Sequence, residues 1–532
     1  MAIWMRRSVS SRTNSALSRN RAIRSASGGR ALFEGVGGVA IGRHSRDHFS
    51  RQLISYKIFL ADATAYLVAR RILMNNESRV LDMARHFHSQ TDPRLHEDHG
   101  PLTIVAGEGA TVTDDAGNRY IEGMGGLWCA SLGFSDSRLA VAADRQMRKL
   151  AVYHTFNHRS NEPTVELVEQ LTALAPFDNA RVFLVGSGSE ANDTMVKLAW
   201  YYQAARGRPE KRKIISRFGA FHGSTIMGAA LSGLPHMHKS FNLPPLPVIF
   251  AARPFHYLDG LPAEAEHDYA TRLAQELEAL ILAEGPETIA AMIAEPVMGA
   301  GGVLVPPEGY FPKVQAVLRK YDILMLSDEV VCGFGRTGNW FGSQTFGMEP
   351  DMLSVAKGLS SGHLPIGGVI ISDKVYQCVA DEAHKVGVFG HGFTYSGHPV
   401  TAAVAAEAIR IYREIDLVSQ ARRLGDYLHA ALADALNDHT LVGEVRGRGF
   451  IAGIQIVEDR ATRRAFAPEL RIGTDVERRC REHGVMIRNM GDVLAICPPY
   501  VIAPKEIDYM VDGIRAALDE TAAEHLRTGQ LA

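Results

Sequence analysis

The chain is poor in cysteine and carries almost no net charge. Its five cysteines form no C-x-x-C pair and are too sparse for a disulfide framework, which favours structural thiols in a reducing compartment. A formal net charge of -2 over 532 residues gives no electrostatic reason to expect nucleic acid or an anionic membrane surface as a partner. No stretch reaches the roughly 18 uncharged apolar residues of a membrane-spanning helix. These absences favour a small-molecule partner and predict no membrane span.

The chain is long enough for two or three domains. Hydrophobic residues make up 46% and charged residues 22% of it, as in an ordinary globular protein with a large core. The first 50 residues hold nine Arg, nine Ser and only two acids, a composition that resembles an organelle transit peptide. An upstream reading frame wrongly joined to the gene explains the same segment, because Met74 is a plausible natural start. We therefore leave residues 1–73 out of the predicted fold.

A repeated strand and helix pattern begins at about Ala180. Short apolar segments (RVFLV, KIIS, IAAMIAE, ILMLSDE, MLSVA, GGVIIS) alternate with helical stretches, which predicts a mainly parallel sheet covered by helices. Alternating apolar residues around the turn DDAGN predict a hairpin before this region, and helices with the strand-like GFIAGIQIV follow it. We predict a large α/β domain over residues 146–400 and a smaller α+β domain built from residues 74–145 and 401–532.

The segment LMLSDEVVCGFGRTGNW, residues 324–340, allows three interpretations of Asp328. The metal-holding strand of a nucleoside triphosphatase would require a G-x-x-x-x-G-K-[ST] loop upstream, and the sequence contains no Gly-Lys dipeptide. Three glycines spell the dinucleotide-binding pattern G-x-G-x-x-G, but the last of them, Gly338, is followed by the loop-like NWFGSQTFG instead of a helix. The third interpretation assigns Asp328 to a different cofactor.

Two further segments support this third interpretation. In VGSGSEAND, Ser187 to Glu190 match a capping box at a strand-to-helix junction, which can hold a phosphate or simply cap the helix. Lys357 comes just after the strand MLSVA, so it can reach the same sheet edge as Asp328. A lysine can form a Schiff base with an aldehyde, and a carboxylate can keep a pyridine nitrogen protonated. Together these functions predict pyridoxal 5'-phosphate (PLP) as cofactor, although either residue alone is typical of a surface or a turn.

Six motifs carry a family resemblance. GSGSEAND, FGAFHGST, IAEPVMGAGG, LSDEVVCGFGRTG, SVAKGLSSGHLPIGG and HGFTYSGHP occur in the order and spacing of class III (omega) aminotransferases. The likeness extends from about Met74 to the C-terminus. It implies the α/β fold of type I PLP-dependent transferases, with a mainly parallel seven-stranded sheet in the large domain and a smaller α+β domain.

The resemblance also implies roles for individual residues. Lys357 is the Schiff-base lysine and the acid/base that moves the proton, and Asp328 pairs with the pyridinium nitrogen. The other implied cofactor contacts are Ser187, Gly188, Ser189, Phe221, His222, Glu295, Val330 and Thr394. The first three bind the phosphate together with Thr394, which in this family comes from the neighbouring subunit. A homodimer or a dimer of dimers with shared active sites is therefore expected.

Several of these assignments have alternatives. Phe221 stands where the family usually has tyrosine; stacking needs the aromatic face, so cofactor binding survives without the hydroxyl, with Val330 on the opposite ring face. His222 is either a cofactor neighbour or a structural histidine. Glu295 either supports the cofactor or forms a salt bridge at a strand end.

The residues expected around the substrate differ from those of some class III aminotransferases. Members that process ornithine, acetylornithine or 4-aminobutyrate carry an arginine where this chain has Ala495 and a glutamate where it has Ala300. Arg488 instead resembles the mobile arginine of amine:pyruvate aminotransferases, and Trp128 resembles the aromatic wall of their substrate pocket, although a core tryptophan is also possible. This combination favours a primary amine, a polyamine such as putrescine or an omega-amino acid as donor, and pyruvate as acceptor, giving alanine.

Two alternatives to transamination stay open at this point. An aminomutase or dialkylglycine decarboxylase has the same fold, and a non-catalytic PLP-fold protein would act through its dimer surface. We predict no metal site. The expected location is the cytoplasm, or an organelle if the Arg/Ser-rich N-terminus is a transit peptide.

Overall fold

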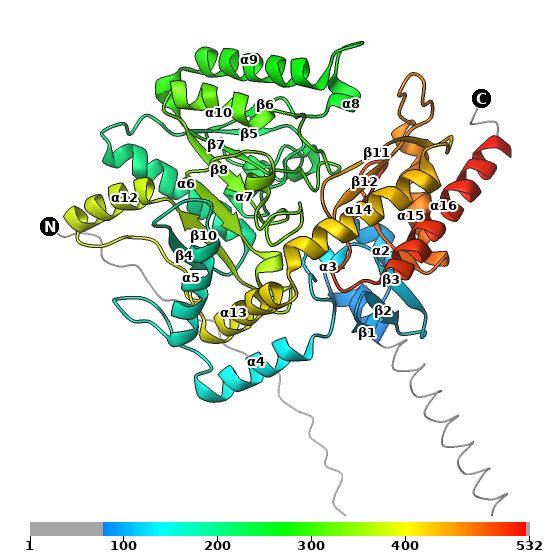
Figure 1. Ribbon diagram of the computed structural model, residues 1–532, viewed down its shortest axis with the longest axis horizontal. Helices are drawn as coiled ribbons and strands as arrows, with labels where there is room; N and C mark the ends of the chain where they lie inside the picture. Colours follow the sequence, from blue (N-terminus) through cyan, green and yellow to red (C-terminus); the bar gives the residue numbers. More distant parts are fainter. Residues whose placement is uncertain (1–77, 528–532) are drawn as a thin grey trace, which may run out of the picture. The chain divides into compact units, whose positions relative to one another are not determined.

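The computed structural model describes residues 78–527 (Figure 1). Residues 78–81 are helical and belong to a separate unit, and the described chain from Asp82 onward belongs to one compact unit. The predicted extension over residues 1–73 and the alternative start at Met74 lie outside the described residues.

A seven-stranded sheet forms the centre of the compact unit, as the sequence predicts. In spatial order its strands are β4 (Arg181–Val185), β10 (Gly367–Ile371), β9 (Met352–Val355), β8 (Leu324–Asp328), β7 (Ile289–Ala294), β5 (Lys213–Arg217) and β6 (Val248–Ala251). Strand β10 runs antiparallel to both neighbours, and the other six strands are parallel to one another. The mainly parallel sheet is therefore confirmed.

Helices cover both faces of this sheet (Figure 1). Successive strand residues point to opposite faces, and Ile214 and Ile215 accordingly lie in different core clusters. One face packs against α6 (Gly188–Ala205), α7 (Ile226–Leu231) and α12 (Asp373–Val386), and the other against α5 (Glu162–Leu174), α9 (Glu266–Glu284), α10 (Tyr310–Lys320) and α13 (Pro399–Glu414). Burial on both faces explains why the strands are apolar along their whole length.

Two smaller sheets accompany the large one. The first contains β1 (Ile104–Glu108), β2 (Thr111–Asp114), β3 (Arg119–Glu122) and β13 (Val485–Met486). The second contains β11 (Val442–Gly447), β12 (Ala452–Ile456), β15 (Val493–Ile496) and β14 (Arg488–Asn489), next to α14 (Leu417–Leu436), α15 (Ile472–Glu482) and α16 (Pro504–Arg527). Strand β13 pairs with β3, so segments from both ends of the chain share one sheet. The domain boundaries at residues 146 and 401 stay predictions.

The predicted hairpin before the large sheet is present as β2 and β3. Its turn is held by Asp114, whose carboxylate accepts hydrogen bonds from the backbone N–H groups of Ala116 at 3.0 Å and Asn118 at 2.8 Å. Strand β1 pairs antiparallel with β2, so the segment is a three-stranded meander rather than a single hairpin. The remaining helices are α2 (Pro93–His99), α3 (Gly125–Trp128), α4 (Ser137–Lys149), α8 (His256–Asp259) and α11 (Gly342–Thr345).

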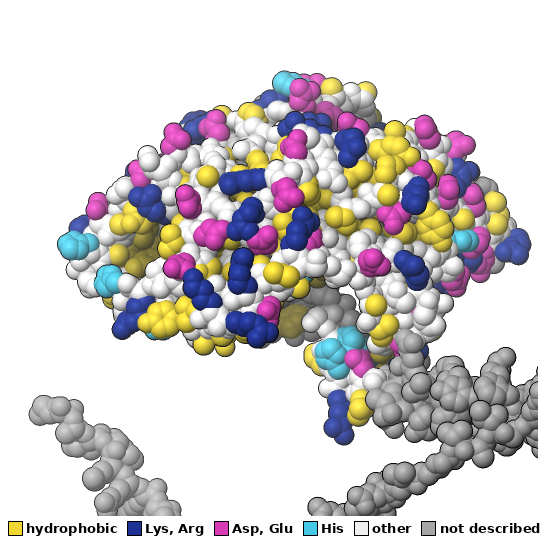
Figure 2. All heavy atoms as spheres, turned by 60° about the horizontal axis from the view of Figure 1, so that its bottom comes forward, with side chains coloured by type: hydrophobic (Ala, Val, Ile, Leu, Met, Phe, Trp, Pro, Cys, Tyr) yellow, Lys and Arg dark blue, Asp and Glu magenta, His cyan; other side chains and the backbone are white. Residues whose placement is uncertain are grey.

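The surface carries charges of both signs. Figure 2 shows Lys and Arg mixed with Asp and Glu over the face drawn, without one continuous basic area. Among residues 78–527, no helix combines the length and the apolar character needed to cross a bilayer.

Glu122 holds the turn that leads from β3 to α3. It is 7% exposed, and its carboxylate accepts hydrogen bonds from the backbone N–H groups of Met124 and Gly126. Burial raises the pKa of Glu122 to about 7, in spite of these two hydrogen bonds. Trp128, at the end of this turn, has a left-handed backbone with φ 65°. The Glu122 carboxyl group thus supports an unusual backbone next to the predicted substrate pocket.

Glu122 should make the stability of the fold depend on pH. Because its pKa of about 7 in the folded state lies above the ordinary value of 4.5, stability is lost as pH rises from 4.5 towards 7. Glu122→Gln has no ionisable group at this position. The substitution should therefore remove a pH-dependent loss in the free energy of unfolding of up to about 3 kcal/mol over this pH interval. The measurement is the midpoint of urea unfolding at several pH values, with Glu108→Gln on the exposed edge of β1 as control. An unchanged pH slope in Glu122→Gln would contradict this role.

Candidate active site

The ends of neighbouring parallel strands bring the predicted site residues together. Asp328 is the last residue of β8, and Lys357 follows the end of β9. These two strands are paired, with Asp328 opposite Ser354. Glu295 directly follows β7, the neighbour of β8 on the other side, and both Asp328 and Glu295 act electrostatically on Lys357. Lys357 and Asp328 therefore share one edge of the sheet.

Asp328 is almost fully buried, at 4% exposure, and is held from several sides. Its Oδ2 accepts a hydrogen bond from Nδ2 of Asn192 at 2.7 Å and lies 2.8 Å from Nδ1 of His222. Its Oδ1 accepts the backbone N–H of Val330 at 3.0 Å. Burial opposes the charge, but the hydrogen bonds, led by that from His222, hold the pKa of Asp328 below its ordinary value. The carboxylate stays ionised and can pair with a protonated nitrogen.

Lys357 combines an unusual backbone with weakened basicity. Its φ of 48° lies in the left-handed region, which is strained for a residue with a side chain. Burial lowers the pKa of Lys357, and the negative charge of Asp328 offsets part of that shift. A larger share of the lysine is consequently present as the neutral amine, the form that acts as nucleophile and base.

The start of α6 has the features of an anion site. Ser187 caps the helix, since its Oγ accepts the backbone N–H of Glu190 at 3.2 Å. The predicted capping box is only half correct, because the Glu190 carboxylate binds the backbone N–H of Gly186 at 2.6 Å instead of that of Ser187. Gly186 has no Cβ, which leaves room for this carboxylate. The helix start presents backbone N–H groups and the positive end of its dipole, as a phosphate requires.

Two glycines allow three segments to meet closely at this helix start. A Cβ on Gly188 would lie 2.9 Å from a methyl group of Val330 in the loop after β8. Gly223 has φ 129°, and a Cβ there would lie 2.8 Å from Cβ of Ser189. The Oγ of Ser189 also accepts the backbone N–H of Ser224 at 3.1 Å. A larger residue at either glycine would fill the space beside the candidate phosphate site.

Glu295 is held by backbone groups. Its Oε1 accepts the backbone N–H of Phe221 at 3.2 Å, and its Oε2 accepts that of Gly299 at 3.1 Å. Within residues 78–527 no cation lies within salt-bridge distance of Glu295, so the alternative of a strand-end salt bridge is wrong. Burial raises its pKa. Glu295 positions the backbone that carries Phe221.

Two buried polar atoms beside Asp328 lack partners in the described part of the chain. These are Nε2 of His222 and Oδ1 of Asn192. Buried polar atoms in folded proteins are nearly always hydrogen-bonded. These two atoms are therefore available to bind a polar group of a ligand or a water molecule beside Asp328. Asn192 was not predicted as a site residue. The signal that could have identified it is a polar residue on the inward face of a helix, next to the apolar and fully buried Ala191 and Met195.

Trp128 is buried, with 4% exposure. It lies in a small apolar cluster with Val297, two residues after Glu295, with Ala495 of β15, and with Cys497, which directly follows β15. Trp128 therefore connects the turn after β3 to the loop after β7. This position is compatible with a pocket wall and with a core residue, and the role of Trp128 stays a prediction.

Arg488 lies directly opposite Ala495 on paired strands. Among residues 78–527, no side-chain hydrogen bond or ion pair joins Arg488 to a partner. Burial lowers the pKa of Arg488, and the negative charge of Glu477 opposes this shift. Arg488 is the one arginine on the β14–β15 hairpin.

Thr394 lies apart from these contacts. It is exposed, and no hydrogen bond links it to the strand-end residues within the described chain. Its contribution to the phosphate site from a neighbouring subunit stays a prediction.

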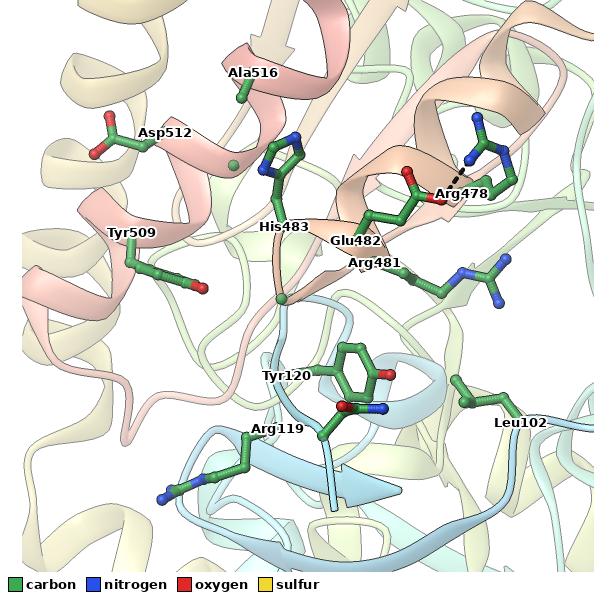
Figure 3. Close-up of a pocket in the computed structure, with 13 residues that line it drawn as sticks. Leu102, Arg119, Tyr120, Arg478, Arg481, Glu482, His483, Tyr509, Asp512 and Ala516 are labelled. Carbon is green, nitrogen blue, oxygen red and sulfur yellow. Dashed lines mark hydrogen bonds and ion pairs between the residues drawn. The ribbon is translucent and has the colours of Figure 1, made fainter. Parts of the chain in front are cut away.

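A large open hollow lies elsewhere on the molecule. Figure 3 shows this hollow, which has a volume of about 950 Å³ and is lined by residues that include Arg119 of β3, Arg481 of α15 and Tyr509 of α16. None of the predicted site residues lines it, and it is open to solvent. Its charges are partly satisfied, because Arg478 forms an ion pair with Glu482 at 2.5 Å. Size alone therefore does not identify the active site here.

The strand-end residues fit a phosphorylated pyridine aldehyde. The start of α6 suits the phosphate, the ionised Asp328 suits a protonated ring nitrogen, and Lys357 suits the aldehyde carbon. The unpartnered atoms of His222 and Asn192 lie at the ring-nitrogen end. Each part of PLP thus has a chemically matched partner.

Comparisons with known proteins agree with this chemistry. The family model for class-III aminotransferases matches residues 94–518. Gamma aminobutyrate transaminase 3, chloroplastic, from Solanum lycopersicum is 47% identical over 422 residues, which cover 79% of this chain and 81% of that protein. Vanillin aminotransferase from Capsicum chinense is 45% identical over 425 residues, covering 80% of this chain and 92% of that protein.

Solved structures lead to the same family. The omega transaminase from Pseudomonas jessenii in complex with PMP superposes with a TM-score of 0.82 and 48% identity, covering 84% of this chain and 98% of that chain. The predicted fold of type I and the PLP cofactor are thereby confirmed, since enzymes of this class use PLP. The chain belongs to the class-III aminotransferase family and catalyses PLP-dependent transamination.

Proposed function

We propose that this aminotransferase moves the amino group of a primary amine, a polyamine or an omega-amino acid to pyruvate and releases alanine. The names of its relatives refer to an omega-amino acid, gamma aminobutyrate, and to an aromatic aldehyde, vanillin. A transaminase that is 52% identical and covers 80% of this chain, with a TM-score of 0.78, was solved with L-alanine. Alanine is the product expected from pyruvate.

The observation that carries the proposal is the pairing of Arg488 with Ala495. Pyruvate has one carboxylate, whereas 2-oxoglutarate has two and needs a second cationic partner. The β14–β15 hairpin supplies a single arginine, and Ala300 removes the glutamate that neutralises a second one in other members. One partly buried cation can bind the carboxylate of pyruvate and can turn towards solvent when an apolar amine enters.

The transfer depends on two residues of the chain. PLP, when bound, supplies the electron sink that stabilises negative charge at the donor carbon. Asp328 keeps the ring nitrogen protonated, because its own pKa is lowered in spite of its burial. Lys357, with its lowered pKa, accepts the proton from the donor carbon and returns it during the exchange.

The other site residues bind and orient the cofactor. Ser187, Gly188 and Ser189 hold the phosphate at the start of α6, and Thr394 of a neighbouring subunit completes that site. Phe221 and Val330 cover the two ring faces, Glu295 positions Phe221, and His222 positions Asp328. Trp128 forms a wall of the substrate pocket. The assembly is a homodimer or a dimer of dimers.

The location proposed is the cytoplasm, with an organelle as the alternative. Some relatives are named as chloroplastic or mitochondrial, which supports the reading of the Arg/Ser-rich N-terminus as a transit peptide.

A substrate panel tests the function. Primary amines, putrescine, β-alanine and taurine should form alanine with pyruvate, and replacing pyruvate by 2-oxoglutarate should abolish most turnover. Lys357→Ala should lower kcat by at least about 1000-fold, whereas Lys385→Ala on the exposed end of α12 should not. Alanine and the carbonyl product are measured by chromatography. An obligatory requirement for 2-oxoglutarate contradicts the proposal, and turnover of an amine without any keto acid would indicate a mutase or a decarboxylase.

Arg488 should contribute only to the half-reaction with the keto acid, and not to the half-reaction with the amine. Arg488→Ala should lower kcat/KM for pyruvate roughly 10- to 100-fold, the loss expected for one charged hydrogen-bonded contact. The half-reaction with an apolar amine should change little, because that donor has no carboxylate. Stopped-flow spectra of the cofactor measure the two half-reactions separately, with Arg481→Ala on the exposed side of α15 as control. Equal losses in both half-reactions would show a structural role instead.

A further inference from the structure

Four side chains with metal-binding atoms meet in the segment that precedes β1 in the sequence. The carboxylate of Asp82 lies 3.2 Å from Nδ1 of His86, 2.7 Å from Nε2 of His88 and 3.0 Å from Nε2 of His96. His96 lies on α2, and the other three precede that helix. The proposed transamination uses none of these residues.

The arrangement of these atoms is compact. Ligand atoms of Asp82, His86 and His88 all lie within 4.8 Å of one another. The ring centres of His86 and His88 are 4.2 Å apart, and those of His88 and His96 are 4.1 Å apart. Bonds of about 2.0 Å to a tetrahedral zinc ion place neighbouring ligand atoms roughly 3.3 Å apart. The distances from the Asp82 carboxylate to the three rings are already close to this value. The ring nitrogens of His86 and His88, which lie within 4.8 Å of each other, would move closer by up to about 1.5 Å.

A hollow lies against this cluster and gives access to it. Its volume is about 200 Å³, and its lining includes His86, His88 and His96. The His86 side chain is 65% exposed, whereas that of His96 is only 9% exposed. The cluster therefore has one open side and one buried side, and the face drawn in Figure 2 shows a group of histidine side chains near its lower edge.

A hydrogen-bonded group without metal is the competing explanation. In that arrangement a single carboxylate would accept hydrogen bonds from three imidazoles, two of them at the same oxygen, Oδ1. Three nitrogen ligands with one carboxylate are the donor set that zinc binds well.

We propose that Asp82, His86, His88 and His96 bind a Zn²⁺ ion, a site that revises the expectation from the sequence that the chain has no metal. Four protein ligands leave no open coordination position, so the ion is structural. It joins the helical residues at Asp82 to the start of α2 and thereby fixes the segment that leads into β1. The ion takes no part in the amino transfer.

Isothermal titration of the full-length holoenzyme with ZnCl₂ tests the proposal. The protein is prepared without a histidine tag and treated with a chelator, and the metal content is confirmed by mass spectrometry. One zinc ion per chain should bind with a Kd of about 1 μM or tighter. Double substitution His86→Ala and His88→Ala should weaken binding at least about 100-fold, whereas His384→Ala at an exposed position of α12 should have no effect.

A second measurement covers the case in which the double variant does not fold. The single substitution His88→Gln keeps the polarity and size of the side chain but changes the ligand, and zinc should raise the Tm of the wild type but not of this variant. The absence of stoichiometric zinc binding to the wild type would overturn the proposal. Equal zinc affinity or an equal rise in Tm in wild type and variants would overturn it as well.

Discussion

The buried charge of Asp328 is the constraint on which the active site depends. A carboxylate with 4% exposure is stable only where hydrogen bonds and a positive partner replace water. Asn192 of α6, His222 after β5 and the backbone of Val330 after β8 each supply one hydrogen bond. Breaking such a buried arrangement costs about 3 to 5 kcal/mol. One side chain thus couples three separate segments around the position of the cofactor ring.

Helix α6 links this charge to the phosphate site. Its first turn provides the backbone groups next to Ser187, and Asn192, about 6 Å further along the helix axis, contacts Asp328. That spacing is on the scale of a small aromatic ring. Gly188 and Gly223 allow the neighbouring loops to approach the same turn. One helix therefore sets the distance between the proposed phosphate site and Asp328, so the surrounding loops do not have to set that distance.

Local sequence patterns predicted the sheet and the positions of Lys357 and Asp328, because strand ends and glycine turns are short-range features. Packing between distant segments was not predictable in the same way. The bonds from Asn192 and His222 to Asp328, the backbone partners of Glu295 and the raised pKa of Glu122 all depend on it. The histidine cluster at Asp82 follows no regular spacing and becomes visible only when α2 folds back towards it. Burial alone also cannot separate a pocket wall from a core residue at Trp128.

Arg488 keeps its charge although no side chain of the described residues forms a hydrogen bond or an ion pair with it. Arg488 is partly buried, so its charge costs less than that of a fully enclosed arginine, and Glu477 offsets some of the cost. The proposed function needs no glutamate at the position of Ala300, because a glutamate partner is required only for an arginine that stays permanently inside the pocket. Ala495 leaves space beside Arg488 on the adjacent strand. In the proposed function, the apolar cluster of Trp128 contacts an uncharged amine, and Arg488 enters the pocket only with a carboxylate that compensates its charge.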